Sequence, residues 1–318
     1  MTRKLFLFAL ILILGLGVLF TENSRVRWFE DQCQWNTIHL QEGTIDLAIF
    51  GSSRSARAVH AIEIEKSAAK FISPNLVVYD FSRTQRGLGH SYIMIKELLS
   101  NRRVSKLMVE FNSTHNRIYH DLMYLKSGVL DLAVEYQSEQ HKPALTRAAF
   151  VLSSFIRRVA KRWEQLLLGK IELKPWGKVD VVKAKSTDCV GPRNSIEPSV
   201  LLSAEKKQGD SWFSEGRTWN LEGPGEQRND FYVKQIIKLA TKYNTDLTFF
   251  HVVGRYTSLM STEQLASFEN RYQTKIIQPS EAELRIWFAQ DAYNDPSHMT
   301  LKGSQLFANW VTKEALLP

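Results

Sequence analysis

The decapeptide IDLAIFGSSR, residues 45–54, joins an apolar run to a turn of one glycine and two serines. The run from Ile45 to Phe50 is long enough for a buried strand, and the residues from Ser55 onward carry apolar side chains at helical spacing. A strand that ends in a Gly-Ser turn and leads into a helix places a hydroxyl at the carboxyl edge of a parallel sheet. Open α/β folds usually bind their ligands at that edge. The stretch therefore predicts both a fold class and the place of a site.

Strand-like and helix-like segments alternate through most of the chain. Short apolar runs predict strands over 45–50, 75–79, 106–111 and 247–253. Apolar residues at helical spacing predict helices over 55–70, 89–99, 231–243, 261–272 and 300–317. Such alternation is typical of an α/β protein in which helices cover both faces of a parallel sheet, so we predict a three-layer sandwich.

The third and fourth predicted strands lie too far apart for a single crossover connection. The excess predicts a largely helical insertion over 113–228. Its best-defined helix, 148–168, has apolar residues on one side: Leu152, Phe155, Ile156, Val159, Trp163 and Leu166. Basic residues lie mostly away from that side: Arg157, Arg158, Lys161 and Arg162. Such a helix either packs its apolar side on its own domain or lies on a membrane surface.

The amino terminus has the pattern of a membrane-targeting segment. Arg3 and Lys4 precede an uncharged apolar run, Leu5 to Phe20, which is shorter than the ~20 residues that usually span a bilayer. No small-x-small cleavage site follows, so we predict an uncleaved signal anchor, with a cleaved secretion signal and a buried helix as alternatives. Basic residues before the run favour a cytoplasmic amino terminus and a body in the periplasm or outside the cell. The predicted plan is an anchor over 1–21, a linker over 22–43 and a domain over 44–318.

Composition narrows the classes of function. The chain has 318 residues, 44% hydrophobic and 23% charged, as expected for a folded protein. Its net charge of +8 is compatible with nucleic acid, but for an exported protein anionic lipid or acidic polysaccharide is a better partner. The same net charge is also expected if the excess of lysine and arginine only keeps the surface soluble.

The residues that could hold a metal or form a disulfide are few. Cys33 and Cys189 are able to pair across a long loop but are too sparse for a metal site. His115, His120 and His251 fit no metal-binding spacing. We therefore predict no metal, no cofactor and no nucleic-acid partner.

Far from the Gly-Ser turn, Asp295-Pro296-Ser297-His298 supplies a carboxylate and an imidazole three residues apart. Together with a serine of the turn they form a nucleophile, a base and an orienting acid, the set used in hydrolysis and acyl transfer. His298 would accept the serine proton while Asp295 holds the imidazole tautomer. Each residue also has a structural alternative: a helix cap for the serine, a surface position for the histidine and a turn position for the aspartate.

These two stretches resemble the first and last blocks of the SGNH (GDSL-type) hydrolase superfamily. In the first block a glycine, one variable residue and the catalytic serine follow the first strand, and Gly51-Ser52-Ser53 matches with Ser53 as the nucleophile. The last block is Asp-x-x-His before the final helix, which Asp295 and His298 match, followed by Leu301-Lys302-Gly303. The resemblance covers about 46–310 apart from the insertion, and it implies the flavodoxin-like sheet arrangement of that family.

The middle blocks of the family add a glycine N–H and an asparagine amide to the serine N–H in an oxyanion hole. Gly87 is our candidate for the glycine, with Gly89 as the alternative, and Asn112 is the candidate amide. The third block departs from the family pattern because Glu110 occupies its glycine position. Arg54 is expected to bind an anionic group of the substrate or to form a salt bridge.

A membrane anchor combined with such a body resembles superfamily members that modify envelope or exported polysaccharides at the outer face of bacterial membranes. The resemblance implies a serine esterase or O-acyltransferase that works through an acyl-Ser53 intermediate. Its expected partners are an acylated polysaccharide, the cytoplasmic membrane and a membrane-bound acyltransferase. Whether water or a sugar hydroxyl accepts the acyl group depends on how well the site excludes water. The alternative is a non-catalytic accessory protein of the same fold that binds polysaccharide or a membrane acyltransferase.

Overall fold

The structure is a computed structural model that divides into two compact units. One, here called the hairpin unit, comprises 1–41 and 119–189; the other, the sheet unit, comprises 42–118 and 190–318. The structure describes residues 25–28, 37–39, 42–82, 87–111, 129–140, 142–167, 171–174, 224–252, 259–290, 292–293 and 298–317.

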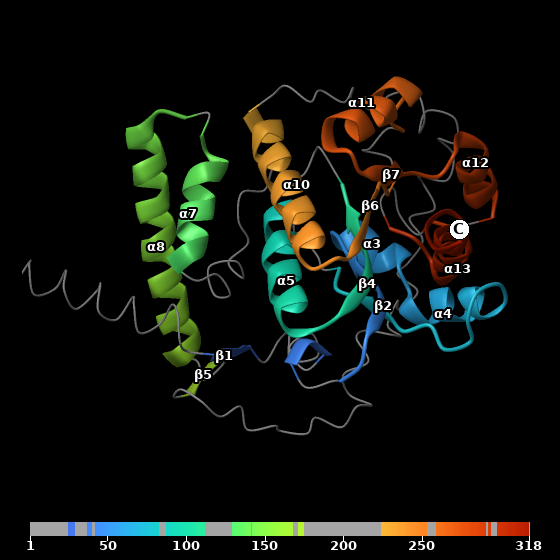
Figure 1. The fold of residues 1–318 in the computed structure, drawn as a ribbon, viewed down its shortest axis with the longest axis horizontal. Coiled ribbons are helices and arrows are strands. Elements are labelled where there is room, and N and C mark those ends of the chain that lie inside the picture. Colours follow the sequence, from blue (N-terminus) through green and yellow to red (C-terminus); the bar gives the residue numbers. More distant parts are fainter. Residues whose placement is uncertain are drawn as a thin grey trace, which may run out of the picture. The chain divides into compact units, whose positions relative to one another are not determined.

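A five-stranded parallel sheet forms the centre of the sheet unit (Figure 1). Its strands, in spatial order, are β3 (Val78–Asp80), β2 (Ile45–Phe50), β4 (Val104–Glu110), β6 (Asp246–Phe250) and β7 (Lys275–Ile277). The chain builds outward from β2 in one direction to β3 and in the other to β4. The strand order therefore reverses between β2 and β4, where open α/β sheets leave a crevice outside the carboxyl ends of the strands.

Helices lie on both faces of this sheet (Figure 1). On one face α5 (Leu88–Asn101) packs beside α10 (Pro224–Lys242). On the other, α4 (Ala61–Ala69) packs beside α13 (Leu301–Val311), which continues into a π-helical turn, Thr312–Leu316. The remaining helices of the unit are α3 (Ser53–Ala58), α11 (Thr262–Tyr272) and α12 (Glu281–Ala289). The α/β class and the parallel sheet are confirmed, and helices on both faces are compatible with the predicted sandwich.

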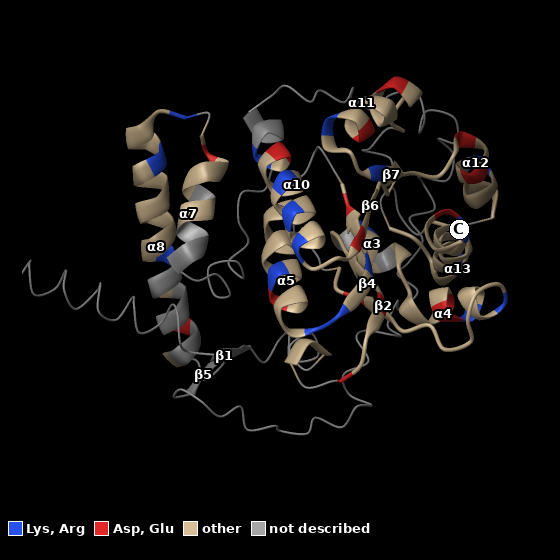
Figure 2. Cartoon of the chain, viewed as in Figure 1, with Lys and Arg blue, Asp and Glu red and all other residues tan. Residues whose placement is uncertain are grey.

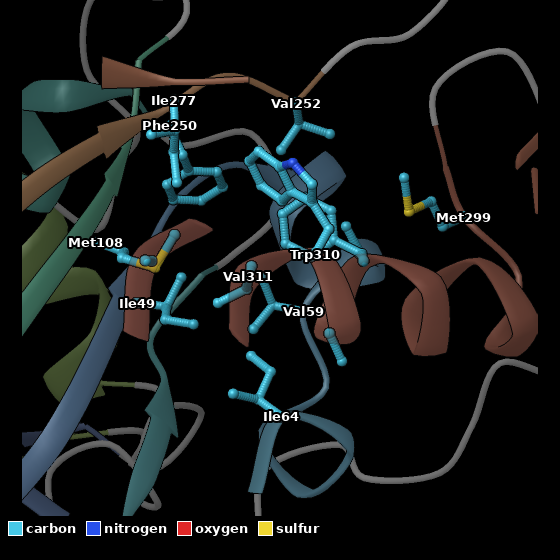
Figure 3. Packing of buried hydrophobic residues seen from close by; sticks show 14 of the residues in the cluster. Ile49, Val59, Ile64, Met108, Phe250, Val252, Ile277, Met299, Trp310 and Val311 are labelled. Atoms are coloured by element: carbon cyan, nitrogen blue, oxygen red, sulfur yellow. The ribbon is translucent and has the colours of Figure 1, made fainter. Parts of the chain in front are cut away.

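The alternation of side chains along the strands builds the core. Leu47, Ile49, Met108 and Phe250 are buried and join the cluster formed with α4, α12 and α13. Figure 3 shows Trp310 and Val311 of α13 on the side of the strands that carries Ile49, Met108 and Phe250. Burial of one such large side chain contributes about 1.5–3 kcal/mol, which makes this layer a main source of stability. It also fixes α13, the helix that follows the predicted Asp-x-x-His block.

In the hairpin unit, α7 (Val129–Ser138) is followed by α8 (Ala144–Leu167), and a two-stranded antiparallel ribbon joins β1 (Arg25–Trp28) to β5 (Ile171–Lys174). Strand β1 lies within the stretch that we predicted to be a linker. The predicted insertion ended at 228, but α10 begins at Pro224 and packs in the sheet unit.

Several predicted elements differ from the observed ones. The helix predicted over 55–70 is two helices, because Val59 is extended and buried between α3 and α4. The strand predicted at 75–79 is displaced to Val78–Asp80. Strand β7 and helix α12 were not predicted. Among the described residues no helix is both long and apolar enough to cross a bilayer. The predicted anchor lies outside the described residues.

Candidate active site

The turn after β2 lies at the reversal point of the sheet. Gly51 and Ser52 connect Phe50 to α3, whose first residue is Ser53. Ser52, in an extended conformation, is the N-cap of this helix, and its Oγ accepts a hydrogen bond from the Arg54 N–H at 3.3 Å. The capping role that we considered for Ser53 therefore belongs to Ser52. The Ser53 side chain lies outside the described part of the structure.

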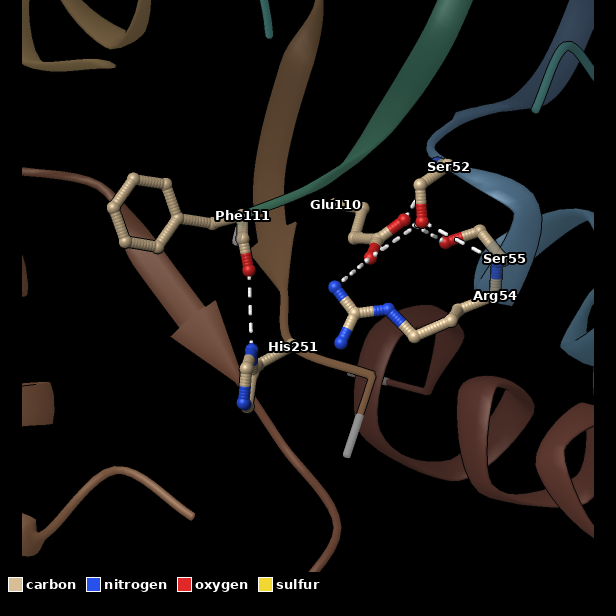
Figure 4. A network of polar contacts seen from close by, with 6 residues as sticks. All are labelled: Ser52, Arg54, Ser55, Glu110, Phe111 and His251. Carbon is tan, nitrogen blue, oxygen red and sulfur yellow. Dashed lines mark hydrogen bonds and ion pairs between the residues drawn. The ribbon is translucent and has the colours of Figure 1, made fainter. Parts of the chain in front are cut away.

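The Glu110 carboxylate lies beneath this turn and holds it (Figure 4). The Ser52 N–H donates to Oε2 at 2.6 Å and the Ser52 Oγ donates to Oε1 at 3.0 Å. Ser55 Oγ donates to Oε2 at 2.6 Å, and Arg54 Nη2 lies 3.5 Å from Oε1. Both charged residues are only 5% exposed. Three hydrogen bonds and an ion pair thus join the end of β4 to the start of α3.

The two charges have opposite effects on each other's titration. Burial by itself raises the pKa of Glu110, but the Arg54 guanidinium and the hydrogen bonds from Ser55 and Ser52 outweigh it and hold that pKa below its usual value. Burial lowers the pKa of Arg54, which Glu110 and Tyr293 partly oppose. At neutral pH the network is therefore an ionised pair, and the region beneath the turn carries no net charge.

The turn requires glycine at position 51 because of this close packing. A Cβ at Gly51 would overlap Ser55 Oγ and would lie 2.7 Å from Glu110 Oε2. Glycine in the Gly-x-Ser motif is therefore required by packing, because a side chain at position 51 would leave no room for the Glu110 carboxylate. Glu110 itself stands at the glycine position of the third block.

The start of α3 also lies near the segment that leads into the last predicted block. Tyr293, just before that block, is buried and stacks on Phe288 with ring centroids 4.5 Å apart. Burial raises the pKa of Tyr293 well above its usual value, although the Arg54 charge opposes this shift. Helix α3 also packs against α13. Segments more than two hundred residues apart in sequence therefore meet at this point.

The ends of the Asp-x-x-His segment are tied together. Tyr293 and Met299 form an antiparallel bridge, and the Thr300 N–H donates to the Ala292 carbonyl at 2.9 Å. Thr300 caps α13 by accepting from the Gly303 N–H at 3.1 Å. A Cβ at Gly303 would collide with the Ala292 carbonyl, so the glycine of the Leu-x-Gly motif allows the segment to close against the helix.

The structure describes some of the other predicted site residues and not others. His298 is described and partly buried. Asp295 and Asn112 lie outside the described residues. Gly87 is the N-cap of α5, and its carbonyl accepts from the N–H groups of His90 and Ser91 at 3.0 and 3.2 Å. Arg54 is in the salt bridge that we named as one of its two possible roles.

The end of β4 also contacts β6. The Phe111 N–H donates to the Phe250 carbonyl at 2.8 Å, and His251 Nδ1 lies 3.1 Å from the Phe111 carbonyl (Figure 4). Because a carbonyl oxygen only accepts, Nδ1 carries the proton. His251, predicted to be structural or to face the substrate, thus fixes the backbone immediately before Asn112.

Sequence reasoning missed the roles of Glu110 and Tyr293. An acidic residue that ends the apolar run Leu107-Met108-Val109 was a usable signal, because such a run predicts a central parallel strand that is buried on both faces. A buried carboxylate needs hydrogen-bond donors, and the nearby turn is rich in serine. Tyr293 offered no comparable signal, since its partner is distant in sequence. Cys33 and Cys189 lie outside the described residues.

No protein-family model matches this chain, and no curated protein matches it either. The interpretation of the site therefore depends on its geometry and on the resemblance of the two blocks.

Proposed function

We propose that this chain is a membrane-anchored extracytoplasmic serine esterase or O-acyltransferase of the SGNH type. The observation that carries the proposal is the packing of the two helices that adjoin the predicted blocks. Helix α3, which begins at Ser53, packs against α13, which begins three residues after His298. Helix α3 starts at the reversal point of the parallel sheet, where such folds bind their ligands.

In the proposed reaction, Ser53 Oγ attacks the acyl carbonyl as His298 accepts the hydroxyl proton. The oxyanion returns its electrons to carbon, the alcohol leaves, and His298 protonates it. Water or a sugar hydroxyl then attacks acyl-Ser53, gives its proton to His298 and releases the acid or the transferred ester. Asp295 is assigned to hold the imidazole tautomer.

Oxyanion stabilisation is assigned to the Ser53 N–H, the Gly87 N–H and Asn112. Gly87 is suited to this role because it caps α5, and N–H groups at a helix start have no partner within the helix. Glu110 supports the arrangement indirectly. Its carboxylate accepts a hydrogen bond from the Ser52 N–H and so fixes the backbone immediately before Ser53.

The substrate class follows from the proposed location. A body outside the cytoplasmic membrane with a net charge of +8 is suited to anionic envelope or exported polysaccharides that carry O-acyl groups. The proposed partners are this polysaccharide, the membrane and a membrane-bound acyltransferase that supplies acyl groups.

A fluorophosphonate probe tests the nucleophile directly. The full chain in mild detergent is labelled, digested and mapped by mass spectrometry, with Ser53→Ala, His298→Ala and Ser52→Ala compared. We expect the label on Ser53, its loss in the first two variants, and its retention in Ser52→Ala, which keeps the Ser52 N–H bond to Glu110. A folded chain that takes no label, or takes it on Ser52, contradicts the proposal.

One observation favours a second candidate, the non-catalytic accessory protein. Glu110 stands where the family has glycine, and its carboxylate fills the space beneath the turn. A folded chain that binds acylated polysaccharide in calorimetry but takes no label on Ser53 supports this candidate over the enzyme.

A further inference from the structure

Helix α8 of the hairpin unit exposes a stripe of aliphatic side chains, here called the α8 stripe: Leu145, Leu152, Ile156 and Leu167. They are 86%, 59%, 55% and 81% exposed. Their spacings of seven, four and eleven residues keep them on one side of a helix with about 3.6 residues per turn. Exposed aliphatic side chains aligned on one side of a helix are typical of a site of interaction with a protein or a membrane.

The opposite side of α8 packs against α7 and includes polar side chains. Ser154 follows Leu152 by two positions, a rotation of about 200°, and it is buried. The Arg147 guanidinium lies 4.5 Å from the ring of Tyr136 on α7. In the connection between the helices, Lys142 forms a 2.8 Å ion pair with the fully buried Glu139. The hairpin thus buries polar groups such as Ser154 and Glu139 while the four aliphatic side chains of the α8 stripe remain exposed.

We propose that the α8 stripe docks on the anionic surface of the membrane to which the chain is anchored. The proposal rests on the proposed anchor. The first support is charge: the sequence of α8 has five basic residues, Arg147, Arg157, Arg158, Lys161 and Arg162, and one acidic residue, Glu164. Figure 2 shows basic positions in blue on the described part of this helix. A helix with aliphatic residues on one side and basic residues elsewhere binds at the boundary between acyl chains and anionic head groups.

The second support is the path of the chain. Only residues 22–24 separate the predicted anchor from β1, a span of at most about 14 Å. Strand β1 pairs with β5 along its length, from Arg25 opposite Lys174 to Trp28 opposite Ile171. Three residues, 168–170, separate β5 from the end of α8. An anchored β1 therefore keeps the carboxyl end of α8 close to the same membrane surface.

The test measures the depth of single positions in lipid. The full chain, with Cys33→Ser and Cys189→Ser, carries one new cysteine labelled with the fluorophore NBD. It is reconstituted into vesicles of phosphatidylcholine alone or mixed with phosphatidylglycerol, with or without doxyl-labelled lipid. Leu152→Cys and Ile156→Cys report the α8 stripe, and Gln137→Cys, exposed on α7, is the matched control. All three positions are exposed, so labelling should not disturb packing.

We expect doxyl lipid to quench NBD at the two stripe positions about twofold or more relative to the Gln137→Cys control, because docking buries the stripe about 5–10 Å into the interface. The quenching should be stronger in the anionic vesicles. A blue-shifted emission without doxyl quenching would mean that protein covers the stripe, either the sheet unit or a second copy, and overturns the proposal. Quenching equal to the control also overturns it.

The same vesicles separate this proposal from the others. A chain that fails to float with vesicles after an alkaline wash overturns both the anchor and the docking. Fluorophosphonate labelling of Ser53 is read independently, so that a chain that labels without stripe quenching keeps the proposed enzyme function and loses only the membrane docking of α8.

Discussion

Replacing Glu110 by glutamine tests the buried network because it preserves side-chain shape and removes the charge. In the native chain the carboxylate accepts three hydrogen bonds and pairs with Arg54 in a region closed to solvent. Glutamine retains one acceptor oxygen and leaves the Arg54 charge buried without its counter-ion. Disruption of a buried ion pair from one side typically costs about 3–5 kcal/mol. Because the amide keeps part of the hydrogen bonding, we expect a loss of about 3 kcal/mol.

A loss of that size is a large share of the ~5–15 kcal/mol that stabilises an ordinary domain. It corresponds to a change of about 100-fold in the unfolding equilibrium. The assay is guanidinium unfolding of the full chain in mild detergent, followed by the fluorescence of the buried core residues Trp287 and Trp310. The rate of fluorophosphonate labelling at Ser53, measured where each variant is folded, should also fall, because the turn loses the acceptor for the Ser52 N–H.

The chain contains a matched control for this substitution. Glu281 pairs with Arg285 at 2.6 Å, a shorter separation than that of Arg54 and Glu110, but both side chains are more than half exposed. Glu281→Gln should cost about 0.5 kcal/mol or less, because solvent screens surface pairs. Equal losses from Glu281→Gln and Glu110→Gln would refute the reasoning, since burial would then have no effect.

A double-mutant cycle then isolates the ion pair. Arg54→Met alone leaves the Glu110 charge uncompensated and should be destabilising. The double variant Arg54→Met with Glu110→Gln should be more stable than the sum of the single losses predicts, by about 2 kcal/mol. Additive losses would mean that the two side chains do not interact, whatever their separation.

Three further predictions concern pH, loop closure and a remote carboxylate. The pKa of Glu110 is lower in the folded chain than in the unfolded chain. The stability advantage of the native chain over Glu110→Gln should therefore be full above the unfolded-state pKa of about 4.3 and should shrink as pH falls through the folded pKa. Unfolding curves measured across acidic pH test this. Gly303→Ala should lower the free energy of unfolding by about 1–3 kcal/mol and slow the labelling of Ser53, because the new Cβ displaces the Ala292 carbonyl. Lys302→Ala, at an exposed position of the same helix, should change neither the stability nor the labelling rate. Asp230→Asn weakens the contacts of α10 with Tyr272 and Arg271 of α11 and should cost about 1–2 kcal/mol of stability. The rate of Ser53 labelling in folded protein should not change, and a slower rate would contradict our placement of the site.

Local signals in the sequence predicted local structure well. The apolar run before Gly51 predicted β2, and the strand has the same bounds, Ile45–Phe50. Ser261 predicted the start of α11, and it caps that helix in a capping box with Gln264. The same signal, Ser280 with Glu283, stood before α12 and was overlooked. Strand β7 was harder to predict because its three residues are too few to show periodicity.

Partners distant in sequence were beyond such reasoning. Ser52 and Glu110 are 58 residues apart, and they meet because β2 and β4 are neighbours in the sheet. Apolar periodicity indicates which side of an element is buried but not which element covers it. The same limit applies to α8, where the sequence placed Leu152 and Ile156 on the apolar side, whereas their exposure depends on which side packs against α7.

The sequence by itself determined the α/β class, the parallel sheet and the candidate residues Ser53 and His298, because these depend on alternation, turn chemistry and spacing over a few residues. Only the tertiary structure decided that the buried Glu110 carboxylate holds the turn before Ser53, that Arg54 neutralises it, and that the segment leading to His298 closes against α13 at Gly303. The physical reason is that these contacts join residues through the strand order of the sheet. Whether a buried charge is stable depends on the groups that this order brings beside it.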